Sequence, residues 1–384
     1  MIRCLNVEVG GSYGGSLRAL EMHLAFSDRR QFTHDMLFYY PTPGAERLRD
    51  LVEDITVLCP KAPRWLTTGS IHETNILCRW TNWGRLAVAS LRITFSLVRL
   101  IRAGKYNLVH VNNTFTYQAP TILAARLSGV PVVAHVRNPV RQTRISRMLL
   151  RSVGAIATVS RNYESTLAEW GEPVLVRTCY DGIITRVPDM VAAAQLRKSL
   201  LGDGTLLIGA AGRLDQQKAY HHLIEAARLV CLARPDARFA IAGEGPLRPE
   251  LETLIRRFDL GARVMLCGFM PDVGTFLGAL DLFVCSSLWE GLPIAVVEAM
   301  LLGKPVVATD VGGMSEIVRS TEGGSLVPPG DPQALAESLL EAMEGARALA
   351  STAPLRVRRA AELADPLLNA NRLDDLMESV RIHC

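Results

Sequence analysis

Short apolar runs rich in β-branched residues alternate along this chain with longer stretches in which apolar residues recur at helical spacing. This alternation is typical of βαβ units built around a parallel sheet. In the first half of the chain it predicts strands at 3–9, 35–40, 108–111, 130–135 and 155–159, and helices such as 16–26 and 114–128.

The second half of the chain repeats the alternation more clearly. It predicts strands at 206–211, 238–242, 263–267, 282–285 and 305–309, and helices at 220–233, 247–258, 293–302 and 332–343. We therefore expect an α/β protein with two Rossmann-like domains, each with a parallel sheet, facing each other across a cleft. A length of 384 residues suits two such domains.

The expected boundary between the domains is the stretch 181–204, which contains Pro188, Gly202 and Gly204 and has no strand pattern. We interpret it as a linker. It would join an N-terminal domain (1–180) to a C-terminal domain (205–355).

The formal net charge of +4 hides an uneven distribution along the chain. Residues 1–180 contain 22 Lys and Arg against 12 Asp and Glu, whereas residues 181–384 contain 20 against 26. The first half is thus +10 and the second half −6. This asymmetry suggests that the first half faces an anionic partner, such as a phospholipid surface or a phosphate-bearing acceptor. No nucleic-acid-binding motif is evident, so no nucleic acid partner is expected.

The start of the chain and its apolar stretches bear on its location. The first nine residues lack the cationic start and apolar stretch of a signal peptide. The longest apolar region, 86–101, is interrupted by Arg92 and Arg99. We therefore expect no membrane-spanning helix and a cytoplasmic location, which includes the inner face of the membrane. Eight cysteines without a C-x-x-C pair predict reduced thiols and no metal site.

The stretch 281–308 carries the most informative polar residues. An apolar strand, DLFVC, leads through a loop into a helix opened by Pro293, since proline suits the first helical position. Glu290 lies in the loop and Glu298 one to two turns along the helix. Free N–H groups at the helix start form an anion site suited to phosphate. Because carboxylates accept hydrogen bonds from vicinal hydroxyls, the two glutamates indicate a sugar on one side of a phosphate and a ribose on the other.

A second loop, GRLDQQK (212–218), follows the predicted strand 206–211, at the edge where parallel-sheet proteins bind ligands. Arg213 and Lys218 supply the positive charge that a departing diphosphate needs, and Asp215 could orient one of them. Taken alone, the loop would favour a surface loop with two solvated cations, but it does not stand alone.

A glycine-rich loop, GGSYGGS (10–16), joins the first predicted strand to the first helix and lets the backbone approach a ligand closely. It is not a dinucleotide fingerprint, because Ser12 replaces the middle glycine of G-x-G-x-x-G. The next predicted strand also ends in Tyr39 and Tyr40 and not in an acidic residue. A NAD-dependent oxidoreductase is therefore disfavoured, and a purely structural turn stays open.

His135 ends the predicted strand 130–135 and is followed by Arg137 and Asn138. A histidine at the carboxyl end of a parallel strand faces the ligand-binding edge. The sequence leaves open whether this histidine is catalytic or a hydrogen-bonded structural residue.

Together these motifs resemble those of the retaining glycosyltransferases of family 4 (glycosyl transferases group 1), which have the GT-B fold. The resemblance rests on DLFVCSSLWEGLPIAVVEAMLLGKPVVATDVGGMSEIV from residue 281, then GGSLVPPGDPQALAESL, with GRLDQQK and GEGP (243–246) upstream. It covers the whole second predicted domain. The first matches loosely, through Gly14 and Gly15, VHVNN (109–113) and His135.

The resemblance implies that the first domain (1–180) binds the acceptor and the second (205–355) binds the nucleotide-sugar donor, and it implies roles for the donor-site residues. Arg213 and Lys218 would bind the diphosphate, and Glu298 the ribose hydroxyls. Glu290 would be catalytic and hold the donor sugar together with Gly291, Leu292 and Pro293. The nucleotide base would lie along Gly268, Phe269 and Met270.

In the first domain the resemblance implies that Gly14 and Gly15 approach the phosphates and that a catalytic His135 lies near the transferred sugar. It also implies that the last helix, within 356–384, crosses back to the first domain. Two positions depart from the family: Ala219 replaces a usual glycine, and Val136 replaces a frequent aspartate. The second departure leaves the role of His135 open.

The implied reaction is a metal-independent, hexosyltransferase-type transfer that retains the anomeric configuration and needs no cofactor. The donor would be a UDP- or GDP-sugar, and the acceptor a sugar or lipid-linked hydroxyl in glycolipid, lipopolysaccharide or exopolysaccharide synthesis. The cations and helix N–H groups would replace a metal electrostatically. A nucleotide-sugar epimerase of the same architecture and a non-catalytic nucleotide-sugar binder are the alternatives.

Two features suggest peripheral contact with an anionic membrane. Arg137, Arg141, Arg144 and Arg151 recur at helical spacing among apolar residues that include Ile145 and Met148, and Trp80 and Trp83 precede a basic apolar helix. A solvated cationic face with ordinary core tryptophans is the alternative.

Overall fold

The chain forms two compact units, which are described separately below. Unit 1 comprises Met1–Gly182 and Pro366–Cys384, and unit 2 comprises Ile183–Asp365. The computed structural model describes residues 1–10, 14–59, 76–113 (side chains from 89 on), 115–185, 187–319, 324–345 and 350–382. Of the helices in this described part, none combines the length and apolar character needed to cross a membrane.

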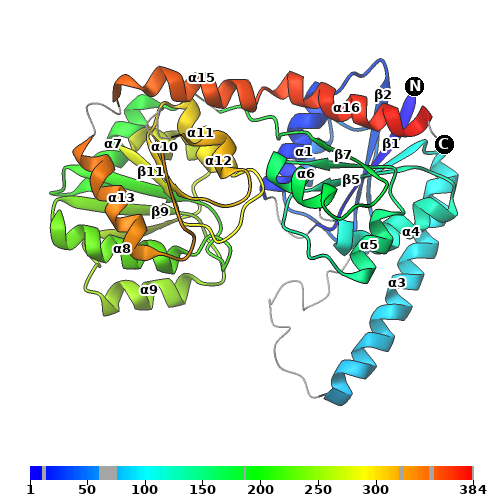
Figure 1. Ribbon diagram of the computed structural model, residues 1–384, viewed down its shortest axis with the longest axis horizontal. Helices are drawn as coiled ribbons and strands as arrows, with labels where there is room; N and C mark the ends of the chain where they lie inside the picture. The colour runs from blue at the N-terminus through cyan, green and yellow to red at the C-terminus, as the bar shows by residue number, and fades with distance from the viewer. Residues whose placement is uncertain are drawn as a thin grey trace. The chain divides into compact units, whose positions relative to one another are not determined.

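Unit 1 is built on a parallel sheet of seven strands in the order β3-β2-β1-β4-β5-β6-β7 (Figure 1). The strands are β1 (Ile2–Glu8), β2 (Phe32–Phe38), β3 (Ile55–Val57), β4 (Leu108–Val111), β5 (Val132–Val136), β6 (Ala155–Thr158) and β7 (Leu175–Thr178). Because β1 pairs with both β2 and β4, the strand order reverses at β1, and such a reversal is where open α/β sheets bind ligands.

Unit 1 also contains helices, several of which contact this sheet. They are α1 (Gly15–Phe26), α3 (Ile76–Gly104), α4 (Ala119–Leu127), α5 (Arg144–Leu150), α6 (Arg161–Ala168) and α16 (Pro366–Ile382), with 3-10 turns η1 (Ala45–Leu48) and η2 (Phe115–Gln118). Helix α16, from the end of the chain, lies beside α1, and its Leu373, Leu376 and Met377 join the core formed by the strands (Figure 1). Gly154 admits this helix, since a Cβ there would lie 2.2 Å from Val380 Cγ1.

Unit 2 is built on a parallel sheet of six strands in the order β10-β9-β8-β11-β12-β13. They are β8 (Leu206–Ala211), β9 (Ala237–Ala242), β10 (Val264–Gly268), β11 (Leu282–Cys285), β12 (Val306–Thr309) and β13 (Gly324–Val327). The helices are α7 (Met190–Leu201), α8 (Tyr220–Ala233), α9 (Arg248–Arg257), α10 (Val273–Ala279), α11 (Ile294–Leu301), α12 (Met314–Ile317), α13 (Pro332–Glu344) and α15 (Ala353–Leu363). The order reverses between β8 and β11, so the loops after these two strands meet at one edge.

The stretch 181–204, expected to be a linker, contains a helix. Helix α7 begins after Asp189, whose carboxylate accepts hydrogen bonds from the N–H groups of Val191 and Ala192, and it packs against α10 within unit 2. The prediction missed it because the absence of a strand pattern does not exclude a helix.

Candidate active site

The loop after β8 begins where its backbone lies very close to that of the loop after β9, and it ends in a strained residue. Gly212 has φ +155° and Gly243, after β9, has φ +147°; a Cβ on Gly243 would lie 1.9 Å from the carbonyl oxygen of Gly212. At the other end of the loop, Ala219 precedes α8 with φ +47°, a left-handed conformation that strains a non-glycine residue by about 1 kcal/mol. The strain explains why glycine suits this position better.

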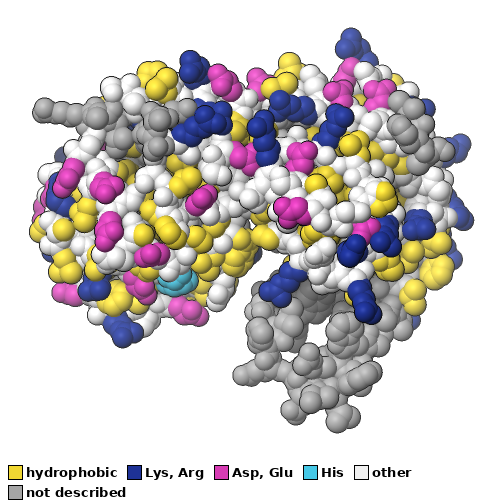
Figure 2. Space-filling model, viewed as in Figure 1, with side chains coloured by type: hydrophobic (Ala, Val, Ile, Leu, Met, Phe, Trp, Pro, Cys, Tyr) yellow, Lys and Arg dark blue, Asp and Glu magenta, His cyan; other side chains and the backbone are white. Residues whose placement is uncertain are grey.

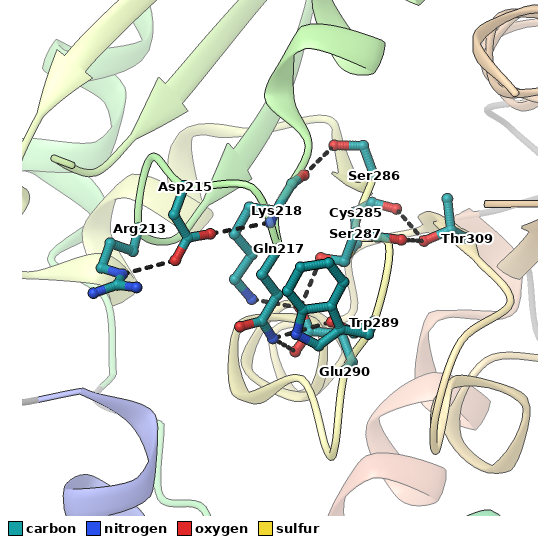
Figure 3. Close-up of polar contacts among 10 residues, drawn as sticks. All are labelled: Arg213, Asp215, Gln217, Lys218, Cys285, Ser286, Ser287, Trp289, Glu290 and Thr309. Carbon is teal, nitrogen blue, oxygen red and sulfur yellow. Dashed lines mark hydrogen bonds and ion pairs between the residues drawn. The ribbon is translucent and has the colours of Figure 1, made fainter. Parts of the chain in front are cut away.

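Lys218 and Glu290 form the central ion pair of the site (Figure 3). Lys218 Nζ lies 2.5 Å from Glu290 Oε1, and the two side chains are 21% and 6% exposed. Burial is the largest single effect and acts to lower the pKa of Lys218, but Glu290, Cys285 and Asp215 together outweigh it, so that this pKa is raised. Lys218 is therefore a fixed cation at the carboxyl edge of the second sheet.

Two further side chains hold the Glu290 carboxylate in place (Figure 3). Ser287 Oγ donates to Glu290 Oε1 at 2.7 Å, and Gln217 Nε2 donates to Oε2 at 3.2 Å. Thr309, at the end of β12, donates to the carbonyl oxygen of Ser287 at 2.6 Å. Gln217, Ser287 and Thr309 were not singled out from the sequence, because their role depends on contacts between three separate loops.

Two adjacent glycines, Gly312 and Gly313, support the loop that carries Glu290. Gly312 has φ +57°, and a Cβ there would lie 1.9 Å from the carbonyl oxygen of Glu290. The N–H of Gly313 donates to the carbonyl oxygen of Gly291 at 3.0 Å. A side chain at position 312 would therefore displace the backbone that carries Glu290.

Helix α11 brings its start to the same place. Pro293 is the residue before the helix, with φ −77° and ψ 97°, and not its first residue as predicted. Pro293 and Ala295 line one pocket together with Lys218, Ser286 and Ser287. Glu298 lies farther along the helix and is 4% exposed. The backbone N–H groups of the helix start and the Lys218 cation thus face a common space suited to an anion.

Arg213 and the stretch 268–270 lie at the same edge of the sheet. Arg213 is 66% exposed, and its Nε donates to Asp215 at 2.7 Å; Figure 3 shows it on the far side of Asp215 from Lys218. Gly268 ends β10 with φ +76°, and its carbonyl oxygen accepts from the N–H of Gly243. Phe269 is 74% exposed, so its ring is free to stack on a planar ligand.

In unit 1, His135 lies in β5 and is 2% exposed. Its Nδ1 lies 3.2 Å from Arg137 Nη2. Arg137 also donates to Asn112, which follows β4, and to Asp181. Asn112 in turn donates to Glu8, at the end of β1. This buried network at the ends of three strands was not predicted, and Asp181 was assigned to the linker.

Gly14 precedes α1, with open space around its Cα, and Gly15 begins the helix. Residues 11–13 of the glycine-rich loop lie outside the described residues. The contact of Gly14 and Gly15 with phosphates stays a prediction.

Solved structures of other proteins share this fold. The structure of Anabaena Alr3699/HepE in complex with UDP-glucose matches with a TM-score of 0.79 at 21% identity, covering 99% of this chain and 100% of that one. Sucrose-phosphate synthase from Thermosynechococcus elongatus matches with a TM-score of 0.77 at 18% identity, covering 100% of both chains. Two parallel sheets flanked by helices, with these neighbours, define an α/β protein of the GT-B fold, as predicted.

Sequence comparisons give the family. The model for glycosyl transferases group 1 matches residues 192–357, and that for the glycosyl transferase 4-like domain matches residues 44–179. A galactosyltransferase from Escherichia coli that acts on GlcNAc-diphosphoundecaprenol is 26% identical over 66% of this chain and 70% of its own length. The 2-deoxystreptamine glucosyltransferase of Streptomyces kanamyceticus is 28% identical over 79% of this chain and 83% of its own length. The chain belongs to the group 1 glycosyltransferases and is an enzyme of that class.

Proposed function

We propose that this glycosyltransferase moves a sugar from a nucleotide-diphosphate sugar to a hydroxyl group and retains the anomeric configuration. The Lys218–Glu290 ion pair carries this proposal, because it places a cation and a hydrogen-bond-accepting carboxylate together at the start of α11. A diphosphate and a sugar are the two parts of one ligand that would satisfy both groups.

Binding of the donor would separate the Lys218–Glu290 ion pair, because each of the two groups would take a new partner on the donor. The diphosphate would take Lys218 and the N–H groups at the start of α11, and Glu290 would then accept hydrogen bonds from sugar hydroxyls. Arg213, which is largely exposed, would reach the diphosphate from the other side. These cations would stabilise the negative charge that develops on the leaving diphosphate, which is the role a metal plays in other transferases.

The nucleotide would lie beyond the diphosphate. Glu298 would accept hydrogen bonds from the ribose hydroxyls, and the base would lie along Gly268, Phe269 and Met270. The structures of Anabaena Alr3699/HepE with UDP and with UDP-glucose support a uridine nucleotide, and GDP-sugars remain the other candidates.

The two glutamates give a test of the donor site. UDP-glucose, GDP-mannose and ADP-glucose are compared for their ability to raise the melting temperature, and turnover is measured with the best donor. Glu298→Ala is expected to weaken binding of the free nucleotide diphosphate about tenfold or more, because it removes a charged hydrogen-bond acceptor worth about 1.5–3 kcal/mol. Glu290→Ala is expected to leave nucleotide affinity within about threefold but to reduce transfer strongly.

Glu252→Ala is the control for this comparison, since Glu252 is a surface carboxylate in an ion pair with Arg248. Equal effects of Glu290→Ala and Glu298→Ala on nucleotide affinity would contradict the division of roles. No stabilisation by any of the three nucleotide sugars would overturn the donor site itself.

The acceptor is proposed to be a lipid-linked or polysaccharide hydroxyl. The relative from Escherichia coli acts on a diphosphoundecaprenol-linked sugar, and other relatives are named for colanic acid and amylovoran biosynthesis. A lipid-linked acceptor would require the enzyme to work at the inner face of a membrane.

One face of unit 1 suits that surface. Large apolar side chains are exposed on α3 (Leu91, Phe95), α4 (Leu123, Leu127) and α5 (Ile145, Met148). A hydrogen bond from Arg102 to the Leu127 carbonyl joins α3 to α4, and one from Arg126 joins α4 to Ser152, which follows α5. Arg141 and Arg144 are exposed beside them, and Figure 2 shows hydrophobic side chains next to Lys and Arg over α4 and α5. Apolar and cationic groups on one face are typical of binding to an anionic leaflet.

This face differs in part from the one expected. Arg137 does not belong to it, because its side chain is buried against Asp181 and Asn112. Arg147 and Arg151 both pair with Glu172, which reduces their net charge. The side chains of Trp80 and Trp83 lie outside the described residues.

Liposome cosedimentation tests this face. The full chain is expected to bind vesicles that contain phosphatidylglycerol. Replacing both Ile145 and Met148 by Asp is expected to weaken this binding about tenfold or more, since it removes apolar area that would be buried in the membrane and adds negative charge that the anionic lipid repels. Leu232→Asp is the matched control, because Leu232 is 69% exposed on α8 of unit 2. Equal loss in both variants, or no binding at low salt, would contradict the proposal.

A further inference from the structure

A small cavity inside unit 1 is lined by three histidines from three elements: His23 of α1, His110 of β4 and His135 of β5. Its volume of about 10 Å³ has room for one water molecule. His110 and His135 are 0% and 2% exposed, and among the described residues the Nε2 atom of each has no hydrogen-bond partner. Both ring nitrogens of His23 likewise have no hydrogen-bond partner there, although its Nε2 lies 3.5 Å from Asp374 Oδ1. Several unpaired polar atoms on one buried cavity point to a bound ligand.

The protonation of His135 follows from its neighbour. A guanidinium can only donate hydrogen bonds, so His135 Nδ1 must accept from Arg137 Nη2, which lies 3.2 Å away. Burial and the Arg137 cation together lower the pKa of His135 well below its usual value, which keeps the ring neutral. The single ring proton of His135 is therefore on Nε2.

The protonation of His110 follows from Asn6. The amide nitrogen of Asn6 lies 3.2 Å from the backbone carbonyl oxygen of Asp35, which can only accept, so the orientation of the amide is fixed. Its oxygen then faces His110 Nδ1 at 2.9 Å, and that nitrogen must carry the proton. Burial lowers the pKa of His110 to about 3, so the ring is neutral and its Nε2 is a bare acceptor.

The cavity thus has a donor, His135 Nε2–H, and an acceptor, His110 Nε2. The two ring centroids are 5.8 Å apart, and the Nε2 atoms make no direct hydrogen bond. A water molecule could accept from the first and donate to the second. His23, which lines the same cavity, provides a third polar wall.

Beyond His110, further hydrogen bonds continue the series, each residue donating to the next one away from Arg137. Asn6 Nδ2 donates to His34 Nδ1 at 3.2 Å, which places the proton of His34 on Nε2. That nitrogen donates to Ser27 Oγ at 2.9 Å, and Ser27 donates to the Asp374 carboxylate of α16 at 2.9 Å. Every hydrogen bond therefore runs from the Arg137 cation toward the Asp374 anion, and such aligned bonds strengthen one another.

We propose that one buried water bridges His135 Nε2 and His110 Nε2, completing a one-way hydrogen-bond chain from Arg137 to Asp374. In this arrangement His135 is a positioning residue that holds Arg137, whose Nε donates to the carbonyl oxygen of Asn112 and whose Nη1 donates to Asp181. The inference concerns only unit 1 and does not depend on the transfer reaction.

Nitrogen NMR of the full chain with 15N-labelled histidine tests the proposal, because the ring nitrogen shifts report the tautomer directly. At pH 7 we expect neutral rings with the proton on Nε2 in His135 and His34 and on Nδ1 in His110. Single histidine substitutions assign the signals. A charged ring at any of these three positions, or the opposite tautomer at His110 or His135, would overturn the chain.

A high-resolution crystal structure tests the water itself. Density for one water within hydrogen-bond distance of both Nε2 atoms is expected, and an empty cavity would overturn the bridge. Asn6→Asp gives an independent check that does not rest on the water. Among the described residues, Asn6 is the one that donates to His34 Nδ1. Because Asn6→Asp replaces this donor by an acceptor, the His34 proton is expected to move to Nδ1, whereas Ser27→Ala should leave the tautomers of His34 and His110 unchanged. An unaltered His34 tautomer in Asn6→Asp would contradict the proposed direction.

Discussion

Replacing Lys218 by methionine is expected to reduce kcat/KM for sugar transfer by about 10²–10³-fold. The loss of one preorganised hydrogen-bond donor to the charge that develops on a leaving group has an effect of that size. Methionine matches the unbranched lysine side chain as far as Cε and lacks the ammonium group. Steady-state kinetics with the best nucleotide-sugar donor measures the effect. A folded variant that keeps about a tenth or more of the wild-type kcat/KM would contradict the role of Lys218.

The design must separate catalysis from folding, because Lys218→Met leaves the buried Glu290 carboxylate without its cation. Breaking a buried ion pair on one side destabilises a protein by about 3–5 kcal/mol. The double variant Lys218→Met/Glu290→Gln removes both charges, so we expect it to regain most of the lost melting temperature while transfer stays low. Lys198→Met, at an exposed position of α7, is the matched control and should change neither quantity.

Acidification from pH 7 to pH 5 is expected to destabilise unit 1. Burial lowers the pKa of His34 and of His110 to about 3, and lowers the pKa of His23 and His135 well below the usual value. These rings bind protons more readily in the unfolded state. Their contribution to the free energy of unfolding is therefore fully present above pH 6.5 and is lost as the pH falls toward the pKa of the folded state. For each ring that stays neutral, the loss between pH 7 and pH 5 is about 2 kcal/mol.

Three carboxyl groups near these rings oppose the effect. Burial raises the pKa of Asp374 to about 6, and it also raises the pKa of Glu8 and of Asp181. Such groups gain stability as the pH falls; for Asp374 the gain between pH 7 and pH 5 is about 1 kcal/mol. The histidines therefore outweigh the carboxyl groups.

Hydrogen exchange of the amides in β1, β4 and α16, followed between pH 7 and pH 5 and corrected for intrinsic rates, measures this loss in unit 1 separately from unit 2. The variant His110→Leu removes one titrating ring, so its protection should fall less steeply with pH than that of the wild type. Protection that is constant or rises on acidification would contradict the prediction.

Much of the fold could be predicted, because most strands are buried runs of apolar residues. The expected strands 108–111, 206–211 and 282–285 coincide with β4, β8 and β11, and others differ by a residue or a few at their ends. The strands β3, β7 and β13 were missed because they are short and partly exposed, which weakens the apolar signal. Edge strands of this kind depend on pairing with a neighbour more than on their own sequence.

The candidate site was predictable only as far as its motifs. The order and spacing of GRLDQQK and the two glutamates indicated a donor site, and the structure brings Lys218, Glu290 and the start of α11 together. The sequence could not show that Lys218 pairs with Glu290, nor that Ser287 and Gln217 hold the carboxylate. For His135 the sequence gave the strand but not the burial of its ring, because that depends on which side chains from α1 and β4 surround it.

Helix α16 has a consequence for the order in which the two units fold during synthesis. Unit 2 is one continuous stretch, so all of its residues are synthesised before those of α16. Unit 1 begins first but lacks the apolar side chains of residues 373–380 that complete its core, and the Asp374 carboxylate that Ser27 contacts. Although unit 1 is synthesised first, its core can therefore be completed only after the whole of unit 2 has been synthesised, unlike that of a domain made from one continuous N-terminal stretch.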